Sequence, residues 1–171
     1  MNKADNGSYV KLILKSFEID PNDSNIVTSN QTRYTKDKLV DSLTNFSKIV
    51  NERPMYCEAH SMFRHEFERC SDRNLAFQRF CEVNEKNVVA VIEQGSFQVS
   101  DDGKVVMVTA NVKSILPNVD VSKMSFGIRC SRQIRIALGS SAAGVDENGE
   151  LYGRSVTEVN QIITWDVISN A

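Results

Sequence analysis

The sequence predicts an α+β fold, in which a mainly antiparallel sheet closes into a β-barrel flanked by helices. Several segments alternate apolar and polar residues with the period of two that is typical of strands, and many of them are rich in apolar side chains. Fewer segments show the three- and four-residue spacing of an amphipathic helix. We find no internal repeat, low-complexity tract or linker, so residues 1–171 are expected to form one domain.

The first part of the chain combines a strand with a helix. Residues 10–19 alternate and predict a strand, and the polar residues 20–25 predict a turn-rich loop. An amphipathic helix follows, because four apolar side chains recur at helical spacing: Leu39, Leu43, Phe46 and Val50. Thr35 is predicted to be its N-cap, with the hydroxyl accepting a hydrogen bond from the first turn.

Residues 55–60 predict a short strand that runs out to His60. Residues 61–86 are rich in charge and aromatic side chains, and we expect a helical or irregular excursion there. Its aromatic residues are interpreted as core anchors: Phe63, Phe67, Phe77 and Phe80. The charge around them is mixed rather than basic, which does not favour a platform for stacking bases.

The second half is predicted to be mostly β-structure. One strand is expected over 88–99, and a hairpin turn with Gly103 at positive φ leads into its return strand, 105–112. Residues 134–149 predict a long loop of small residues, consistent with a flap beside a site. The closing strand is expected over 159–168.

Composition excludes several classes of partner. The formal net charge of −2 gives no electrostatic reason to expect nucleic acid or an anionic membrane. No apolar run approaches the roughly 20 residues that span a bilayer, and the polar N-terminus does not predict a secretory signal. The four irregularly spaced cysteines are interpreted as reduced thiols of a cytosolic protein.

Three residues could carry hydrolytic chemistry. Ser125 lies in an apolar, extended run with Gly127 two residues on, where a glycine permits close approach of another backbone. A serine nucleophile needs a base, and the chain has two histidines, of which His60 ends a predicted strand. A carboxylate such as Asp166, on the closing strand, can orient that imidazole.

Four stretches in this order resemble the prohead (capsid maturation) proteases of tailed bacteriophages, which share the fold of herpesvirus assemblin. Residues 12–18, with 30–34, resemble the opening strand and the Asn/Arg/Tyr motif before the first helix. Residues 57–60 resemble the motif that presents the catalytic histidine. Residues 124–129 resemble the Ser-x-Gly nucleophile strand, and 165–170 resemble the closing strand.

The resemblance implies a serine endopeptidase that cleaves scaffolding and major capsid proteins inside a procapsid, after synthesis in the host cytoplasm. Ser125 would be the nucleophile, His60 the general base and Asp166 the acid. Self-processing and a homo-oligomer are also implied, and no cofactor, nucleic acid or membrane is expected.

Two parts of this site stay open. Glu58 is an alternative acid, and in other branches the orienting residue falls at the position of Thr164, whose side chain carries no charge. The oxyanion could be bound by Arg129, by Arg132 or by a backbone N–H of residues 134–143.

Other functions remain open as well. Ser141 lies in a sequence close to Gly-x-Ser-x-Gly, but the final glycine is missing. A zinc-binding module could use four side chains with suitable ligand chemistry: Cys57, His60, His65 and Cys70. A third alternative is a capsid- or scaffold-binding β domain without catalytic activity.

Overall fold

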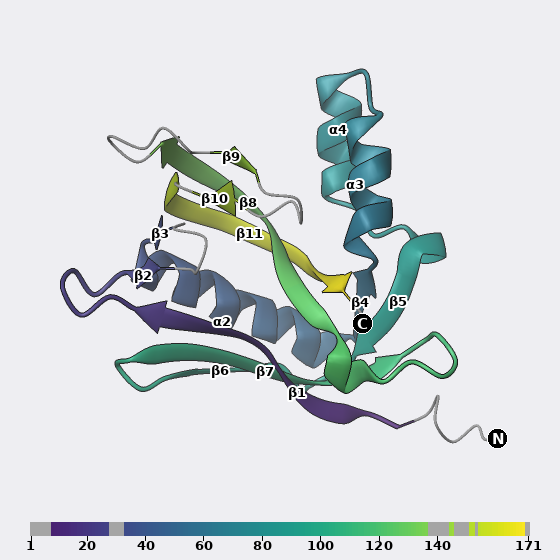
Figure 1. Ribbon diagram of the computed structural model, residues 1–171, viewed down its shortest axis with the longest axis horizontal. Coiled ribbons are helices and arrows are strands. Elements are labelled where there is room, and N and C mark those ends of the chain that lie inside the picture. Colours follow the sequence, from purple (N-terminus) through teal and green to yellow (C-terminus); the bar gives the residue numbers. More distant parts are fainter. Residues whose placement is uncertain (1–7, 28–32, 137–143, 146–150, 153, 170–171) are drawn as a thin grey trace.

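The computed structural model describes residues 8–27, 33–136, 144–145, 151–152 and 154–169 (Figure 1). Its helices are α2 (Lys36–Glu52), α3 (His60–Glu68) and α4 (Arg73–Phe80), with 3-10 turns η1 (Glu85–Asn87) and η2 (Val121–Lys123). The strands are β1 (Val10–Ile19), β2 (Ile26–Val27), β3 (Arg33–Tyr34), β4 (Met55–Glu58), β5 (Val88–Ile92), β6 (Gln98–Asp101), β7 (Val105–Ser114), β8 (Ser125–Ile136), β9 (Gly144–Val145), β10 (Leu151–Tyr152) and β11 (Arg154–Ser169).

The chain has the α+β class that the sequence predicts. Nine strands form one sheet in the order β4-β5-β7-β1-β2-β3-β11-β8, with β6 paired to β7. All of its strand pairs are antiparallel except β11 with β3. Strands β9 and β10 form a separate two-stranded sheet.

The predicted closed barrel is not confirmed, because the hydrogen-bonded path over the described residues remains open between β4 and β8. One isolated parallel bridge, Ala59 to Val167, joins the end of β4 to β11. Apolar strands require burial but do not specify what covers them. Here α2 packs against β11 and β6 and covers much of the apolar surface (Figure 1).

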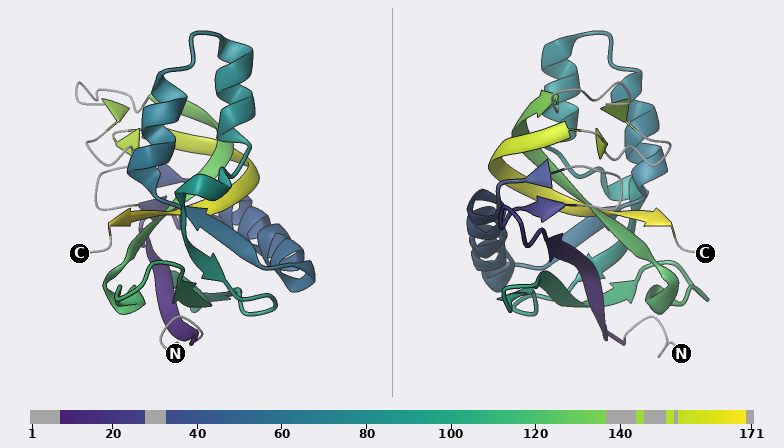
Figure 2. Two further views of the ribbon diagram at one scale, coloured as in Figure 1. Left: turned by 90° about the vertical axis from the view of Figure 1, so that its right-hand side faces the viewer. Right: turned by 60° about the vertical axis from the view of Figure 1, so that its left-hand side comes forward.

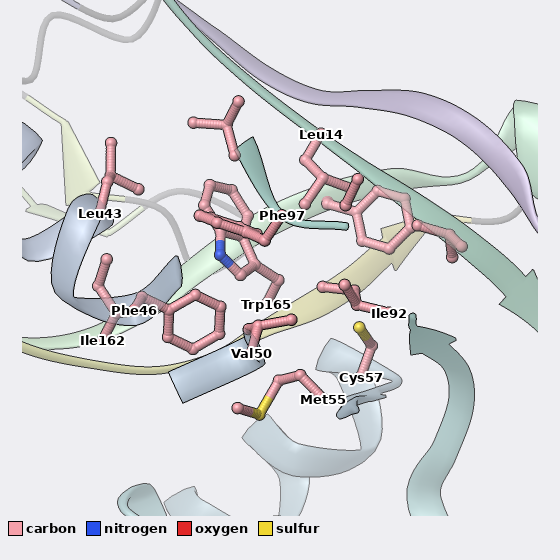
Figure 3. Close-up of a cluster of buried hydrophobic side chains, with 14 of the residues drawn as sticks. Leu14, Leu43, Phe46, Val50, Met55, Cys57, Ile92, Phe97, Ile162 and Trp165 are labelled. Carbon is pink, nitrogen blue, oxygen red and sulfur yellow. The ribbon is translucent and has the colours of Figure 1, made fainter. Parts of the chain in front are cut away.

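Helix α2 supplies one side of the core, as its sequence pattern predicts. The four apolar residues of the predicted stripe are all buried: Leu39, Leu43, Phe46 and Val50. Figure 3 shows Phe46 and Val50 of this stripe close to Trp165 of β11, which is fully buried. The Phe97 ring lies 5.0 Å from Phe46 and 6.2 Å from Trp165, between centroids. Each such side chain contributes roughly 1.5–3 kcal/mol by leaving water.

Thr35 is the N-cap of α2, but the predicted cap hydrogen bond, in which its hydroxyl accepts from a backbone N–H of the first turn, is absent. The Thr35 carbonyl does accept from the backbone N–H of Leu39 at 3.1 Å. The position was predictable from the start of the apolar pattern, whereas the rotamer of the side chain was not.

The predicted single strand over 88–99 is wrong. Strand β5 ends at Ile92 and β6 begins at Gln98, and the two pair with different parts of β7. Gly95 lies between them with a φ of +80°, a conformation that glycine adopts without strain. The hairpin turn before β7 is confirmed, with Gly103 at a φ of +87°.

Residues 60–80 form a helical hairpin that projects from the sheet in both views of Figure 2. Three of its phenylalanines pack together, with centroid distances of 5.6 to 6.0 Å: Phe63, Phe67 and Phe80. The prediction that Phe77 anchors the core is wrong, because this side chain is 61% exposed and α4 has no buried residue. Over the described residues, no helix is both long and apolar enough to cross a bilayer.

The C-terminal strands are longer than expected. Strand β8 continues to Ile136, and the closing strand β11 already begins at Arg154. Residues 137–143, which include Ser141 and most of the predicted flap, lie outside the described residues, as do residues 146–150.

Candidate active site

His60 and Asp166, which are 106 positions apart in the sequence, meet in the structure. The imidazole Nδ1 of His60 lies 3.2 Å from Oδ2 of Asp166. We expected His60 at the end of a strand, but this prediction is wrong. His60 is the first residue of α3, directly after the N-cap Ala59. The bridge between Ala59 and Val167 holds the start of α3 against β11, beside Asp166.

Ser125 lies on the same face of the sheet as this pair. It begins β8, where Phe126 and Ile128 pack toward the hydrophobic core. Side chains alternate along a strand, so Ser125, Gly127 and Arg129 point to the opposite face. Gly127 is paired with Asp166 in the ladder, and Ser125 is exposed.

The topology also places Ser125 near His60. Val167 of β11 is bridged to Ala59 on one side and paired with Phe126 on the other. Because the first pairing is parallel and the second antiparallel, His60 and Ser125 both lie toward the C-terminal end of β11. Two strand spacings separate their backbones, roughly 10 Å.

The histidine and serine are not hydrogen-bonded in this structure. The Nε2 atom of His60 is buried and has no hydrogen-bond partner among the described residues. Gly127, which pairs with Asp166 in the ladder, has no side chain on this face.

The two alternatives for the residue that orients His60, Glu58 and Thr164, make hydrogen bonds to other partners. Glu58 is fully buried, and its carboxylate accepts from Arg79 Nη2 at 2.6 Å and from Arg129 Nη2 at 2.8 Å. The Thr164 hydroxyl donates to the backbone carbonyl of Tyr56 at 2.7 Å. Of the candidates for the third position, the structure therefore brings Asp166 to His60.

Arg129 has a role that sequence reasoning missed. It was a candidate for binding an oxyanion, but Arg129 is buried and all five N–H groups of its guanidinium are used. They donate to five oxygens: both oxygens of Asp166, Oε1 of Glu58 and the carbonyls of Phe80 and Glu82. The sequence did contain one signal for this role: Arg129 follows Ser125 by four residues, so both lie on the same face of the predicted strand.

Buried and partly exposed charges form one network at the base of the hairpin. Three carboxylates, from Glu58, Glu66 and Asp166, face the guanidiniums of Arg79 and Arg129. Burial on its own raises the pKa of Glu58, but the hydrogen bonds from Arg79 and Arg129 outweigh it and hold the pKa below its usual value.

The four residues considered for zinc do not assemble. Cys57 is buried in the hydrophobic core, where desolvation strongly raises the pKa of its thiol, and His65 is exposed. Within the described part of the chain, no group of three or more His, Cys, Asp or Glu side chains could hold a metal ion.

Comparison with protein-family models, with curated proteins and with solved structures gives no match for this chain.

Proposed function

We propose that the protein is a serine endopeptidase, in which Ser125 is the nucleophile, His60 the general base and Asp166 the residue that orients His60. The contact of 3.2 Å between His60 Nδ1 and Asp166 Oδ2 is the observation that carries this proposal. A buried carboxylate that holds one nitrogen of an imidazole leaves the other nitrogen to accept a proton, which is the arrangement that activates a serine.

The reaction would be an acyl transfer through a covalent intermediate. Ser125 Oγ attacks the scissile carbonyl while His60 Nε2 takes its proton, and the imidazolium then protonates the leaving amine. Water hydrolyses the acyl-enzyme by the same steps. Asp166 keeps the proton on Nδ1 and stabilises the imidazolium. Hydrogen bonds of this kind often tighten only when substrate is bound, so the separation of Ser125 from His60 is compatible with the mechanism.

The substrates are proposed from the resemblance of the sequence to prohead proteases. Under this proposal, the protein cleaves scaffolding and major capsid proteins inside a phage procapsid, processes itself and works as a homo-oligomer without a cofactor. An assemblin-like barrel is also part of the proposal. The bridge between Ala59 and Val167, which brings the end of β4 to β11, supports it.

Labelling with a fluorophosphonate tests the nucleophile without knowledge of the substrate. These probes phosphonylate a serine only where a base activates it, and peptide mass spectrometry identifies the modified residue. We expect wild-type protein to be labelled at Ser125 and the Ser125→Ala variant to lose both labelling and cleavage of the capsid proteins, by about 10⁶-fold in rate.

Ser122→Ala provides the matched control, because Ser122 is an exposed serine three residues away whose hydroxyl donates to Asp120. This variant should react like wild type. Labelling that persists in Ser125→Ala, or that maps to Ser141, would disprove the assignment of the nucleophile.

The second candidate function is a non-catalytic domain that binds capsid or scaffolding protein. One observation favours it: His60 Nε2 has no hydrogen bond to Ser125 in the described structure, while Asp166 is held by Arg129. If wild-type protein neither reacts with the probe nor cleaves, yet binds capsid protein, this second function is correct.

A further inference from the structure

We propose that Arg129 is a positioning residue, whose guanidinium fixes the Asp166 carboxylate in the orientation that holds the His60 imidazole. The catalytic consequence rests on the proposed protease function, whereas the effect on the His60–Asp166 contact can be measured without it.

The geometry places Arg129 directly behind the acid. Its Nη2 donates to Asp166 Oδ1 at 2.7 Å and its Nε donates to Oδ2 at 3.2 Å. Two parallel hydrogen bonds of this kind set the plane of a carboxylate as well as its charge. Oδ2 is also the oxygen that lies 3.2 Å from His60 Nδ1, so the plane that Arg129 sets determines where the imidazole is held.

Arg129 is itself held from three other directions. Glu58 of β4 accepts from Nη2 at 2.8 Å, and Nη1 donates to the carbonyls of Phe80 at 3.2 Å and Glu82 at 2.9 Å, at the end of α4. With every N–H engaged, the guanidinium cannot turn without breaking a buried hydrogen bond. A lysine in its place would keep the charge but lose the planar fork.

Phe63 provides a second link between Arg129 and the histidine. The guanidinium carbon of Arg129 lies 3.8 Å from the centre of the Phe63 ring, and that ring lies 6.0 Å from the His60 ring. Phe63 is buried and follows His60 by three residues in α3. Arg129 therefore supports the acid directly and packs on the ring that lies beside the base.

Loss of Arg79 is a suitable control for loss of Arg129, because it measures the structural effect of removing a guanidinium from the same cluster. It also bonds Glu58, at 2.6 Å, and its guanidinium carbon lies 5.0 Å from the centre of the Phe63 ring. No hydrogen bond or ion pair joins it to Asp166 among the described residues. Losing Arg79 disturbs the same cluster without touching the acid.

The experiment compares Arg129→Met, Arg129→Lys and Arg79→Met in a His65→Gln background, so that one histidine remains. Proton NMR detects the Nδ1–H of His60, since a strongly hydrogen-bonded imidazole N–H resonates far downfield. The second measurement is the rate of fluorophosphonate labelling, corrected for the folded fraction by circular dichroism. With a capsid-derived peptide as substrate, kcat and KM are measured separately.

We expect both Arg129 variants to lose or shift the downfield resonance and to react roughly 10²-fold more slowly, the loss typical of a catalytic group displaced by about 1 Å. The effect should fall on kcat rather than KM. Arg79→Met should keep the resonance and the labelling rate of its folded fraction.

If Arg129→Met does not fold, Arg129→Lys decides, because it retains the positive charge. A folded Arg129→Lys with the wild-type resonance overturns the proposal, as does an Arg79→Met variant that loses the resonance to the same extent. If wild-type protein shows the resonance but no labelling, the protease function fails, and the resonance in the Arg129 variants still determines whether Arg129 positions the pair.

Discussion

The chemistry of His60 depends on the hydrogen-bond partner of each nitrogen of its ring. Asp166 lies at Nδ1, and no described residue bonds Nε2. In the proposed mechanism, the tautomer with the proton on Nδ1 is essential, because only then can Nε2 accept the serine proton.

Asp166→Asn is expected to lower kcat by about 10⁴-fold, the loss known for amidation of the triad aspartate in a serine protease, because an amide stabilises the wrong tautomer of the histidine. Single-turnover cleavage or labelling kinetics measure it. Asp120→Asn, at an exposed aspartate that caps η2, is the control and should have wild-type rates. A wild-type rate in Asp166→Asn would show that Asp166 does not orient the base.

The helical hairpin is joined to the sheet by ion pairs at its base. Helix α4 buries no residue, yet Arg79 at its end bonds Glu58 of β4 at 2.6 Å and Glu66 of α3 at 2.7 Å. The same hydrogen bonds lower the pKa of both Glu58 and Glu66. The attachment of the hairpin should therefore weaken when these carboxylates are protonated.

Glu58→Gln is expected to reduce the free energy of unfolding at pH 7 by about 3–5 kcal/mol, the range for breaking a buried ion pair. The folded pKa of Glu58 is lowered, so ionised Glu58 stabilises the fold above its unfolded pKa of about 4.3. This contribution disappears as the pH falls through the lower, folded pKa, so variant and wild type should become equally stable in acid. Urea unfolding between pH 7 and pH 3 measures the difference.

The control for this prediction is Glu68→Gln, which removes the ion pair of Glu68 with Arg64 on the exposed side of α3. It should change the stability by no more than about 1 kcal/mol. A Glu58→Gln variant whose destabilisation is the same at pH 7 and pH 3 would contradict the stated role of the Glu58 charge.

Over the described residues, the molecule has an apolar core on the face of the sheet covered by α2 and a charged cluster on the opposite face. Trp165 faces the core and Asp166 faces the cluster, so consecutive residues of β11 serve the two faces. Helix α2 packs against β11 and β6 on the apolar side, and the α3–α4 hairpin projects from the sheet elsewhere (Figure 1). The loss of unfolding free energy on truncating an apolar side chain should therefore be large in the core and small outside it.

Two phenylalanines, one inside the core and one outside it, test this expectation. Phe46→Ala, in the core, should cost about 3–5 kcal/mol of unfolding free energy, because it leaves a buried cavity. Phe77→Ala should stay within about 0.5 kcal/mol, as for other exposed positions. Urea unfolding followed by Trp165 fluorescence compares them. Equal losses would show that Phe77 is buried in solution and that α4 packs differently.

The sequence alone determined the features that depend on neighbouring residues: the stripe of α2, the alternation of β1 and β11 and the turn at Gly103. It also identified His60, Ser125 and Asp166 as candidates. Only the tertiary structure decided that the sheet stays open, that Phe77 is exposed and that Asp166 rather than Glu58 meets His60. Local sequence patterns indicate which residues need burial or a cap. Contacts between residues far apart in the sequence depend on how the whole chain packs. The sequence could not reveal that all five N–H groups of Arg129 are engaged, because their acceptors come from three separate segments: β4, the end of α4 and β11.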